Sequence, residues 1–191
     1  MNKTITNWLL FSILSIIWGS SFILMKIGLI NHLSPFHIAS LRILSSGIAL
    51  LPIALKVITR FTAKELMLIF LSGALGNLIP AYLFCIAEQR IDSALAAMLN
   101  SLTPIFVIVT GALLFGTKTA ANKAIGIIIA FTGSVLLLFS RNDLKQGQDI
   151  SYGLFVVAAT ISYGYNVNMV SKKLLHIPPL HLTAVALFLN S

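Results

Sequence analysis

The sequence predicts an all-α protein that crosses a membrane several times, and three observations predict it: the composition, a series of long apolar stretches, and an internal repeat. Of the 191 residues, 58% are hydrophobic and 9% are charged. A soluble domain carries charge on roughly a quarter of its residues. The charges here are too few to cover a globule, so lipid must face most of the surface, and helices satisfy their backbone polar groups there.

The apolar stretches have the length that a helix needs to cross a bilayer, about 20 residues. Seven stretches reach or approach it, at roughly 8–28, 36–55, 66–87, 93–115, 124–140, 152–170 and 180 to the end. The junctions are short and polar, and Pro35, Pro178 and Pro179 sit at helix starts, where a missing N–H costs least. The first stretch is too long for a signal peptide and lacks a small-residue cleavage site, so we expect it to remain as a span.

The basic residues indicate how the chain lies in the membrane. The net charge is +8, but lysines and arginines come singly or in pairs between apolar stretches, so we expect no nucleic-acid partner. With a cytoplasmic N-terminus, the inner side holds eight basic residues: Lys3, Lys56, Arg60, Lys64, Lys118, Lys123, Lys172 and Lys173. The outer side then holds three: Arg90, Arg141 and Lys145. This bias predicts a multi-pass protein of the cell (inner) membrane with its N-terminus in the cytoplasm.

An internal repeat relates the two ends of the chain. Residues 30–38 recur as 174–182, with the same spacing of histidines and proline. Trp18-Gly19 aligns with Tyr163-Gly164 after a slip of one residue. The repeat is therefore about 144 residues long and contains five stretches. Because five is odd, the second copy starts from the opposite side of the membrane, as in the inverted repeats that many secondary transporters use for alternating access.

The repeat divides the chain into three parts. We expect a first repeat of five transmembrane helices over 1–141, an outer loop over 142–150, and the start of a second repeat over 151–191. Two complete copies would hold ten spans, of which about seven are present. We therefore expect the sequence to be a fragment or a truncated product of a ten-span protein.

Several spaced motifs resemble one family. Trp18-Gly19-Ser20-Ser21-Phe22, followed by Lys26, Ser34-Pro35 and Arg42, resembles the opening of an EamA-type member of the drug/metabolite transporter superfamily. Residues 94–104 resemble that family's fourth span, and residues 126–137 its fifth. The resemblance implies ten helices in two EamA repeats, and export or exchange of amino acids or related metabolites. Spans eight to ten, which help to line the family's central cavity, are absent from the sequence.

Prolines inside two stretches are the first candidates for a functional role. Pro80 and Pro104 each remove a helix hydrogen bond, and we expect each to kink or open its helix near mid-membrane. Asn77 and Asn100 precede them by three and four residues. A broken helix exposes backbone dipoles, and a nearby amide adds donors and acceptors, so we predict substrate binding at both asparagines. Equally, the amides could satisfy the freed backbone groups or join helices.

Two matched pairs of aromatic and polar residues lie in the first and sixth stretches. Trp18 and Ser21 are three residues apart and share a helix face, and Tyr163 and Asn166 have the same spacing. Such groups near mid-span suit a mostly apolar cavity, so we predict that all four bind substrate. The alternative is that both aromatics pack helices, although Trp18 is too deep for an interfacial belt. Two other polar residues of the sixth stretch point elsewhere and are interpreted as helix contacts: Tyr165 and Asn168.

Two cations lie within or near spans on the predicted outer side. Lys26 and Arg42 could attract a substrate carboxylate, but charge pairing that fixes helix packing, for example with Glu88 or Asp92, is the favoured interpretation. All five acidic residues fall at junctions: Glu65, Glu88, Asp92, Asp143 and Asp149. A proton-coupled carrier usually places a carboxylate inside the bundle, so these positions favour facilitated exchange or a coupling group elsewhere.

The remaining patterns predict structure rather than chemistry. The pairs His32/His37 and His176/His181 fall on opposite sides of the membrane, so we expect no metal site, and we expect no cofactor. Cys85 lies in an apolar stretch and is interpreted as a packing residue. Stripes of small residues let helices approach closely, and we leave open a homodimer through them. They are Ser93, Ala97 and Ser101, and Gly126, Ala130 and Ser134.

Two alternatives to transport remain. A multi-pass enzyme acting on a lipid-linked substrate would need a polar catalytic cluster at one membrane interface, and the loops are too short and poor in such residues to hold one. We therefore predict that the chain is not an enzyme and has no catalytic residues. The second alternative is a truncated remnant without transport activity.

Overall fold

The structure, a computed structural model, describes residues 3–118, 120–140 and 149–191, and all regular structure in these ranges is helical. The α-helices are α1 (Lys3–Ile30), α2 (Pro35–Val57), α3 (Ala63–Gly73), α4 (Ile79–Ala87), α5 (Ser93–Asn100), α6 (Thr103–Phe115), α7 (Ala121–Ser140), α8 (Gly153–Lys173) and α9 (Pro179–Asn190). Two short 3₁₀ turns, η1 (Ile58–Arg60) and η3 (Ile150–Tyr152), and a π-helical turn, η2 (Ala74–Leu78), complete the order. The predicted all-α class is confirmed.

Four stretches of helix in the described part are long and apolar enough to cross a membrane. They are Thr4–Ile30, Pro35–Arg60, Ala63–Ala87 and Ser93–Phe115, and two shorter apolar helices run over Ala121–Gly133 and Pro179–Asn190. This is fewer than the seven spans expected. The sixth expected stretch does form a helix, α8, but its polar residues keep it out of the set of long apolar helices.

Residues at the junctions explain where the helices begin and end. Ser34 caps α2 by accepting the His37 N–H, and Asp92 caps α5 by accepting the Leu95 N–H. Thr62 and Glu65 form a reciprocal capping box at the start of α3. Gly116 ends α6 with φ of 59°, a left-handed conformation that glycine adopts without strain.

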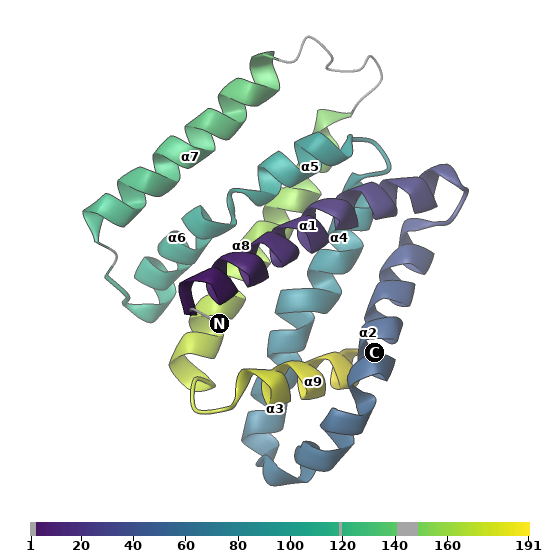
Figure 1. The fold of residues 1–191 in the computed structure, drawn as a ribbon, viewed down its shortest axis with the longest axis vertical. Coiled ribbons are helices and arrows are strands. Elements are labelled where there is room, and N and C mark those ends of the chain that lie inside the picture. The colour runs from purple at the N-terminus through teal and green to yellow at the C-terminus, as the bar shows by residue number, and fades with distance from the viewer. Residues whose placement is uncertain (1–2, 119, 141–148) are drawn as a thin grey trace.

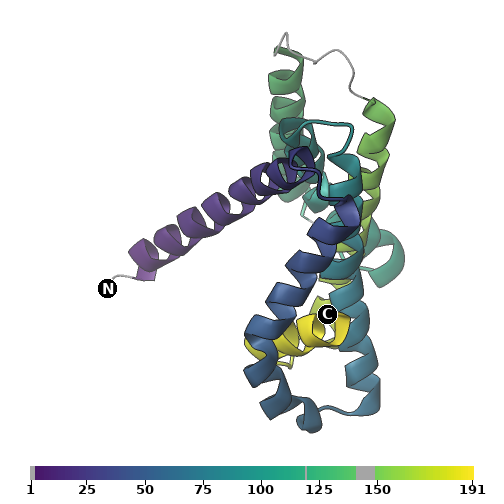
Figure 2. The same ribbon diagram turned by 90° about the vertical axis from the view of Figure 1, so that its right-hand side faces the viewer.

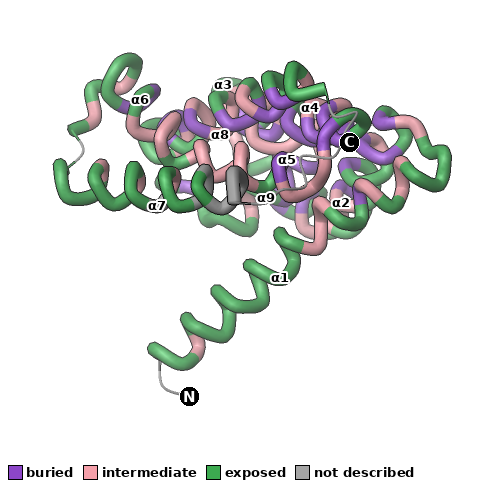
Figure 3. The backbone as a smooth tube through the Cα atoms, turned by 90° about the horizontal axis from the view of Figure 1, so that it is seen from above, coloured by how far each residue is buried: buried purple, intermediate pink, exposed green. Residues whose placement is uncertain are grey.

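The helices gather around α8 (Figure 1), which packs most extensively against α6 and α4. The short helix α9 lies across α2 and α3. The first helix, α1, leans away from the others (Figure 2) and is exposed along nearly its whole length (Figure 3). Its contacts with the body lie near its C-terminal end and are with α2, α4 and α5. Helix α7 lies at the edge against α6 and α5.

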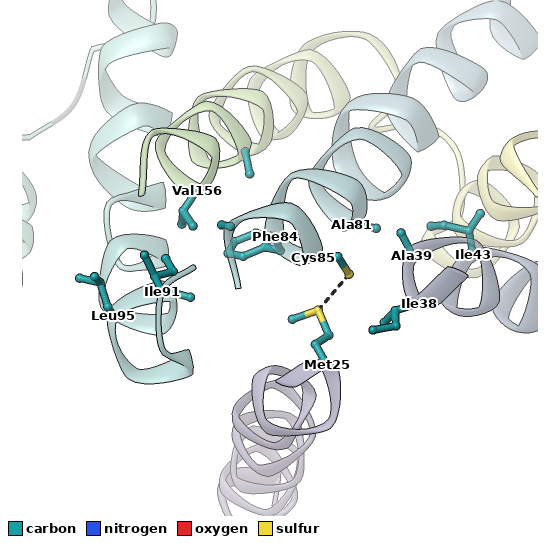
Figure 4. Packing of buried hydrophobic residues seen from close by; sticks show 13 residues of the cluster. Met25, Ile38, Ala39, Ile43, Ala81, Phe84, Cys85, Ile91, Leu95 and Val156 are labelled. Atoms are coloured by element: carbon teal, nitrogen blue, oxygen red, sulfur yellow. Dashed lines mark hydrogen bonds between the residues drawn. The ribbon is translucent and has the colours of Figure 1, made fainter. Parts of the chain in front are cut away.

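Buried apolar side chains form two clusters. The first cluster (Figure 4) joins α1, α2, α4, α5 and α8 around residues such as Met25, Phe84 and Val156. The second cluster joins α2, α3 and α9 around residues such as Ile69 and Val185. The continuous helix α3–η2–α4 contributes to both, so η2 lies between them.

Contacts between loops identify the two ends of the molecule. At one end, the Asp149 N–H donates to the Arg90 carbonyl oxygen at 3.2 Å. At the other, the His176 imidazole lies 2.9 Å from the Glu65 carboxylate. Glu65 and Arg90 stand at opposite ends of α3–η2–α4. The inverted repeat would place these loop pairs on opposite sides of a membrane; the repeat itself and the division at 1–141, 142–150 and 151–191 stay predictions.

Helices α6 and α8 approach closely at Gly164. A Cβ atom there would lie 2.6 Å from the carbonyl carbon and 2.7 Å from the carbonyl oxygen of Phe106. We predict that Gly164→Ala lowers the free energy of unfolding by about 1–3 kcal/mol, because one backbone must move to admit the methyl group. Thermal unfolding of the purified chain in detergent measures this.

Gly126→Ala is the matched control. Nothing lies within 4 Å of a Cβ atom at Gly126 in α7, and alanine is the better helix former. This variant is expected to keep or raise the unfolding temperature. An equal loss in both variants would contradict the close packing of α6 on α8.

Candidate functional site

The π-helical turn η2 lies in the middle of the third apolar helix, which runs over Ala63–Ala87. Pro80 follows it and has no N–H to donate, so the turn cannot keep regular α-helical bonding. The Ile79 N–H instead donates to the Ala74 carbonyl oxygen, five residues back. Single π-helical turns occur often at functional sites. We therefore take this turn as the centre of the candidate functional site.

Polar side chains from α8 and α9 bond the backbone around η2. Ser162 Oγ donates to the Leu75 carbonyl oxygen at 2.9 Å. Asn190 Nδ2 donates to the Phe70 carbonyl oxygen at 3.2 Å and to the Ala186 carbonyl oxygen within its own helix at 2.7 Å. The backbone of the third helix is thus held by side chains that lie far away in the sequence.

Two glycines let two asparagine amides approach the third helix. A Cβ atom on Gly76 would overlap the Asn166 side-chain nitrogen, and one on Gly73 would overlap the Asn190 amide. Residues three apart lie on the same side of a helix, about one turn from each other. Asn166 and Asn190 therefore lie against the same side of α3–η2, about one turn apart.

Both amides have an unused acceptor. Within the part of the chain that the structure describes, Asn166 Oδ1 and Asn190 Oδ1 are buried and accept no hydrogen bond. A buried oxygen without a partner costs about 1–3 kcal/mol. We call Ser162, Asn166, Asn190 and the two glycines the amide site. Its free acceptors suit a ligand that brings N–H or O–H donors.

Asn168, two residues beyond Asn166, is fully engaged instead. Its Nδ2 lies 2.8 Å from the Val107 carbonyl oxygen, 2.9 Å from the Gly164 carbonyl oxygen and 3.1 Å from Thr110 Oγ1. These bonds join α8 to α6, which agrees with its interpretation as a helix contact. Tyr165 is also a helix contact, with its ring centroid 5.3 Å from that of Phe115.

The predicted asparagines and prolines lie at the irregular points of two long apolar helices, Ala63–Ala87 and Ser93–Phe115. Asn77 lies in η2 itself and is half-buried. Asn100 ends α5, and Pro104 opens α6 two residues after the break. Thr103 Oγ1 donates to the Asn100 carbonyl oxygen at 2.8 Å and lies 3.3 Å from its Oδ1. Substrate binding at Asn77 and Asn100 stays a prediction.

The structure does not bring the predicted pair of α1 (Trp18 and Ser21) together with the predicted pair of α8 (Tyr163 and Asn166). Tyr163 packs at the first cluster, with its ring centroid 6.3 Å from that of Phe84, and Ser21 is half-buried. Trp18 is 63% exposed on α1, away from Asn166 and the amide site. A substrate-binding role for Trp18, Ser21 and Tyr163 therefore stays a prediction, whereas Asn166 lies in the amide site.

The two predicted outer cations have protein partners. Lys26 Nζ donates to the main-chain carbonyl oxygens of Glu88 at 2.6 Å and Ile91 at 2.9 Å, which ties α1 to the α4–α5 junction. Arg42 Nη1 lies 2.7 Å from Met25 Sδ. These contacts support helix packing for both cations; attraction of a substrate carboxylate stays a prediction. Glu88, which the sequence places at a junction, directly follows α4 in the structure and is completely buried.

Two residues of the amide site, Ser162 and Asn190, were not predicted from the sequence. Asn190 is a single amide in an apolar stretch, and a lone polar residue at such a position is the signal that could have identified it. Ser162 precedes Asn166 by four residues and so shares its helix face, a spacing that could have drawn attention to it.

Comparison with known proteins gives the class of this chain. The EamA-like transporter family matches residues 6–139, more than half of the chain. The chain therefore belongs to the EamA-like transporter family, as the resemblance predicted, and is a multi-pass membrane protein of a transporter family. No solved structure matches it significantly.

Curated relatives carry names of transporters and efflux pumps. An uncharacterized transporter of Archaeoglobus fulgidus is 29% identical over 186 residues, which cover 97% of this chain and 64% of the relative. A probable amino-acid metabolite efflux pump of Salmonella typhimurium is 24% identical over 170 residues, covering 86% of this chain and 52% of the relative. An uncharacterized inner membrane transporter of Escherichia coli is 30% identical over 128 residues, 65% of this chain and 40% of the relative. The matched part of the chain thus covers 64%, 52% and 40% of the length of these three relatives.

The hydrogen bonds of Lys26 predict that this residue stabilises the packing of α1 on the α4–α5 junction. Lys26→Met leaves the main-chain carbonyl oxygens of two buried residues, Glu88 and Ile91, without their donor, so the free energy of unfolding should fall by about 1–3 kcal/mol. Lys56→Met, at an exposed position in the last turn of α2, is the control and should change thermal unfolding little. If Lys26→Met unfolds at the temperature of the unmodified chain, Lys26 does not fix the packing of α1.

Proposed function

We propose that this chain carries a small metabolite across the cell membrane, as an exporter or exchanger of amino acids or related compounds that works by alternating access. Membership in the EamA-like transporter family supports transport. The names of two relatives, probable amino-acid metabolite efflux pumps of Salmonella typhimurium and Escherichia coli, support the substrate class.

The observation that carries the proposal is the amide site. It lies at the centre of the third apolar helix, between two apolar clusters, so in a membrane it would be near mid-depth. Its two free amide oxygens accept hydrogen bonds, and an amino acid carries an ammonium group that donates them. Small-molecule sites typically combine apolar surroundings with a few oriented polar groups, and the amide site lies between the two apolar clusters.

The contacts between loops support the inverted arrangement. With the N-terminus in the cytoplasm, Glu65 and His176 both belong to the inner side, and Arg90 and Asp149 both belong to the outer side. Glu65 contacts His176 and Arg90 contacts Asp149, at opposite ends of the third helix. Alternating access would then move helices around the amide site, which the π-helical turn makes easier to deform.

Two asparagines of α8 provide the test. We expect Asn166→Ala to lower exchange of radiolabelled amino acids by proteoliposomes about tenfold, equal to about 1.4 kcal/mol, while thermal unfolding stays unchanged. Asn166 has an unused acceptor, so its removal costs the fold little. Asn168→Ala, the matched control, should instead lower the unfolding temperature, because three bonds from its Nδ2 are lost.

The same assay separates the outcomes. Unchanged exchange by a folded Asn166→Ala variant would exclude the amide site as the substrate site. No exchange by the unmodified chain would contradict transport by this chain on its own.

Orientation is tested by reporter fusion. A reporter that is active in the cytoplasm should be active when it is inserted in the 56–64 loop, because that loop carries three of the inner basic residues. A reporter active only outside the cytoplasm should be active when it is inserted at 88–92. The reverse pattern would contradict both the cytoplasmic N-terminus and the proposed topology.

A further inference from the structure

Glu88 is a buried acid that the proposed transport site does not use. It follows the last residue of α4, and its side chain is 0% exposed. Ser93 Oγ lies 3.3 Å from Glu88 Oε2, while Oε1 is buried and has no hydrogen-bond partner within the described residues. Its neighbours Cys85 and Ile91 belong to the first cluster (Figure 4). The carboxyl group is therefore enclosed but only half satisfied.

Charged groups face Glu88 from three helices, yet none pairs with it directly. Lys26 of α1 bonds the main-chain oxygens of Glu88 and Ile91, and Arg42 of α2 contacts Met25. Asp92 is the N-cap of α5, with its carboxylate 2.7 Å from the Leu95 nitrogen. In the described part of the chain, neither cation forms an ion pair with the Glu88 carboxylate.

This environment favours the protonated acid. An ionised carboxylate costs several kcal/mol when it is buried without a paired cation, and a neutral carboxyl costs much less. Burial raises the pKa of Glu88 from 4.5 to about 7, against the opposing effects of the Ser93 hydrogen bond and the Lys26 and Arg42 charges. Asp92 adds to the rise in this pKa. Both forms of the acid are thus present near neutral pH.

We propose that the Glu88 carboxyl is a proton-binding site whose occupancy controls the attachment of α1 to the α4–α5 junction. In the neutral form, Lys26 remains on the two main-chain oxygens and holds α1 in place. When the O–H bond breaks and the proton leaves for water, the carboxylate competes for the Lys26 ammonium group. Lys26 then leaves the main-chain oxygens, and α1 loosens over Cys85, held by its remaining contacts at Phe22 and Met25.

Difference infrared spectroscopy of the chain in lipid nanodiscs tests proton binding. Between about pH 5 and about pH 9, the unmodified chain should lose a protonated-carboxyl band with a midpoint near 7. The band should be absent from Glu88→Gln and retained in Asp149→Asn, which removes an exposed acid from the same end and keeps a good N-cap residue. A missing band in the unmodified chain, or its persistence in Glu88→Gln, would overturn the proposal. The unmodified chain decides the question even if Glu88→Gln does not fold.

Cys85 reports the attachment of α1. It is the chain's one cysteine, it is fully buried, and its Sγ lies 3.6 Å from Met25 Sδ of α1 (Figure 4). The rate of maleimide labelling is compared between the unmodified chain and Glu88→Gln at each pH, so that the pH dependence common to both chains cancels. The ratio should be near one at about pH 5 and rise about threefold or more by about pH 9, and Asp149→Asn should follow the unmodified chain.

A constant labelling ratio would show that proton binding at Glu88 does not move α1. Neither measurement uses transport. Failure of this proposal is therefore distinguishable from failure of the proposed transport function, which the exchange assay tests separately.

Discussion

Backbone polar groups in a lipid environment must form their hydrogen bonds inside the protein. The long apolar helices Ala63–Ala87 and Ser93–Phe115 show how this chain meets that requirement. Pro80 and Pro104 each remove a donor from a helix that is otherwise long enough to span a bilayer. At Pro80 the helix widens into a π-helical turn, and Ser162 of another helix donates to the Leu75 carbonyl oxygen there. At Pro104 the helix stops and restarts, and Thr103 bonds the last carbonyl oxygen of α5. The polar groups near the site follow from this requirement.

The central helix α8 supplies much of that bonding. It donates to α3–η2 through Ser162 and to α6 through Asn168, and it presents Asn166 to Gly76. Each of these polar residues lowers the mean hydropathy of α8. For this reason α8 is not among the four helices of the described part that are long and apolar enough to cross a membrane. A helix surrounded by protein can carry such residues because they do not face lipid. The polar character of α8 thus agrees with its place among α4, α5 and α6.

Much of this fold could be predicted from the sequence, because local signals determine it. Apolar length and prolines predicted the helices and the points where two of them are irregular, at Pro80 and Pro104. The partners of the side chains could not be predicted in the same way. Helical spacing identifies a shared face, as for Trp18 and Ser21, but not what covers that face, and Trp18 is exposed. Glu88 is fully buried, and its main-chain oxygen accepts a hydrogen bond from Lys26, which lies 62 residues earlier in the chain.

The two places with unsatisfied buried oxygens share a physical property. At the amide site, the free oxygens of Asn166 and Asn190 lie beside a π-helical turn, an irregularity that occurs often at functional sites. At Glu88, the free oxygen lies beside the attachment of α1, the most thinly packed of the four long apolar helices. An unpaired buried oxygen costs about 1–3 kcal/mol, enough to shift an equilibrium between two arrangements about fivefold or more when a partner arrives. A ligand or proton that supplies a donor to either oxygen in one arrangement only would favour that arrangement, and this is the physical basis on which the two proposed sites would act.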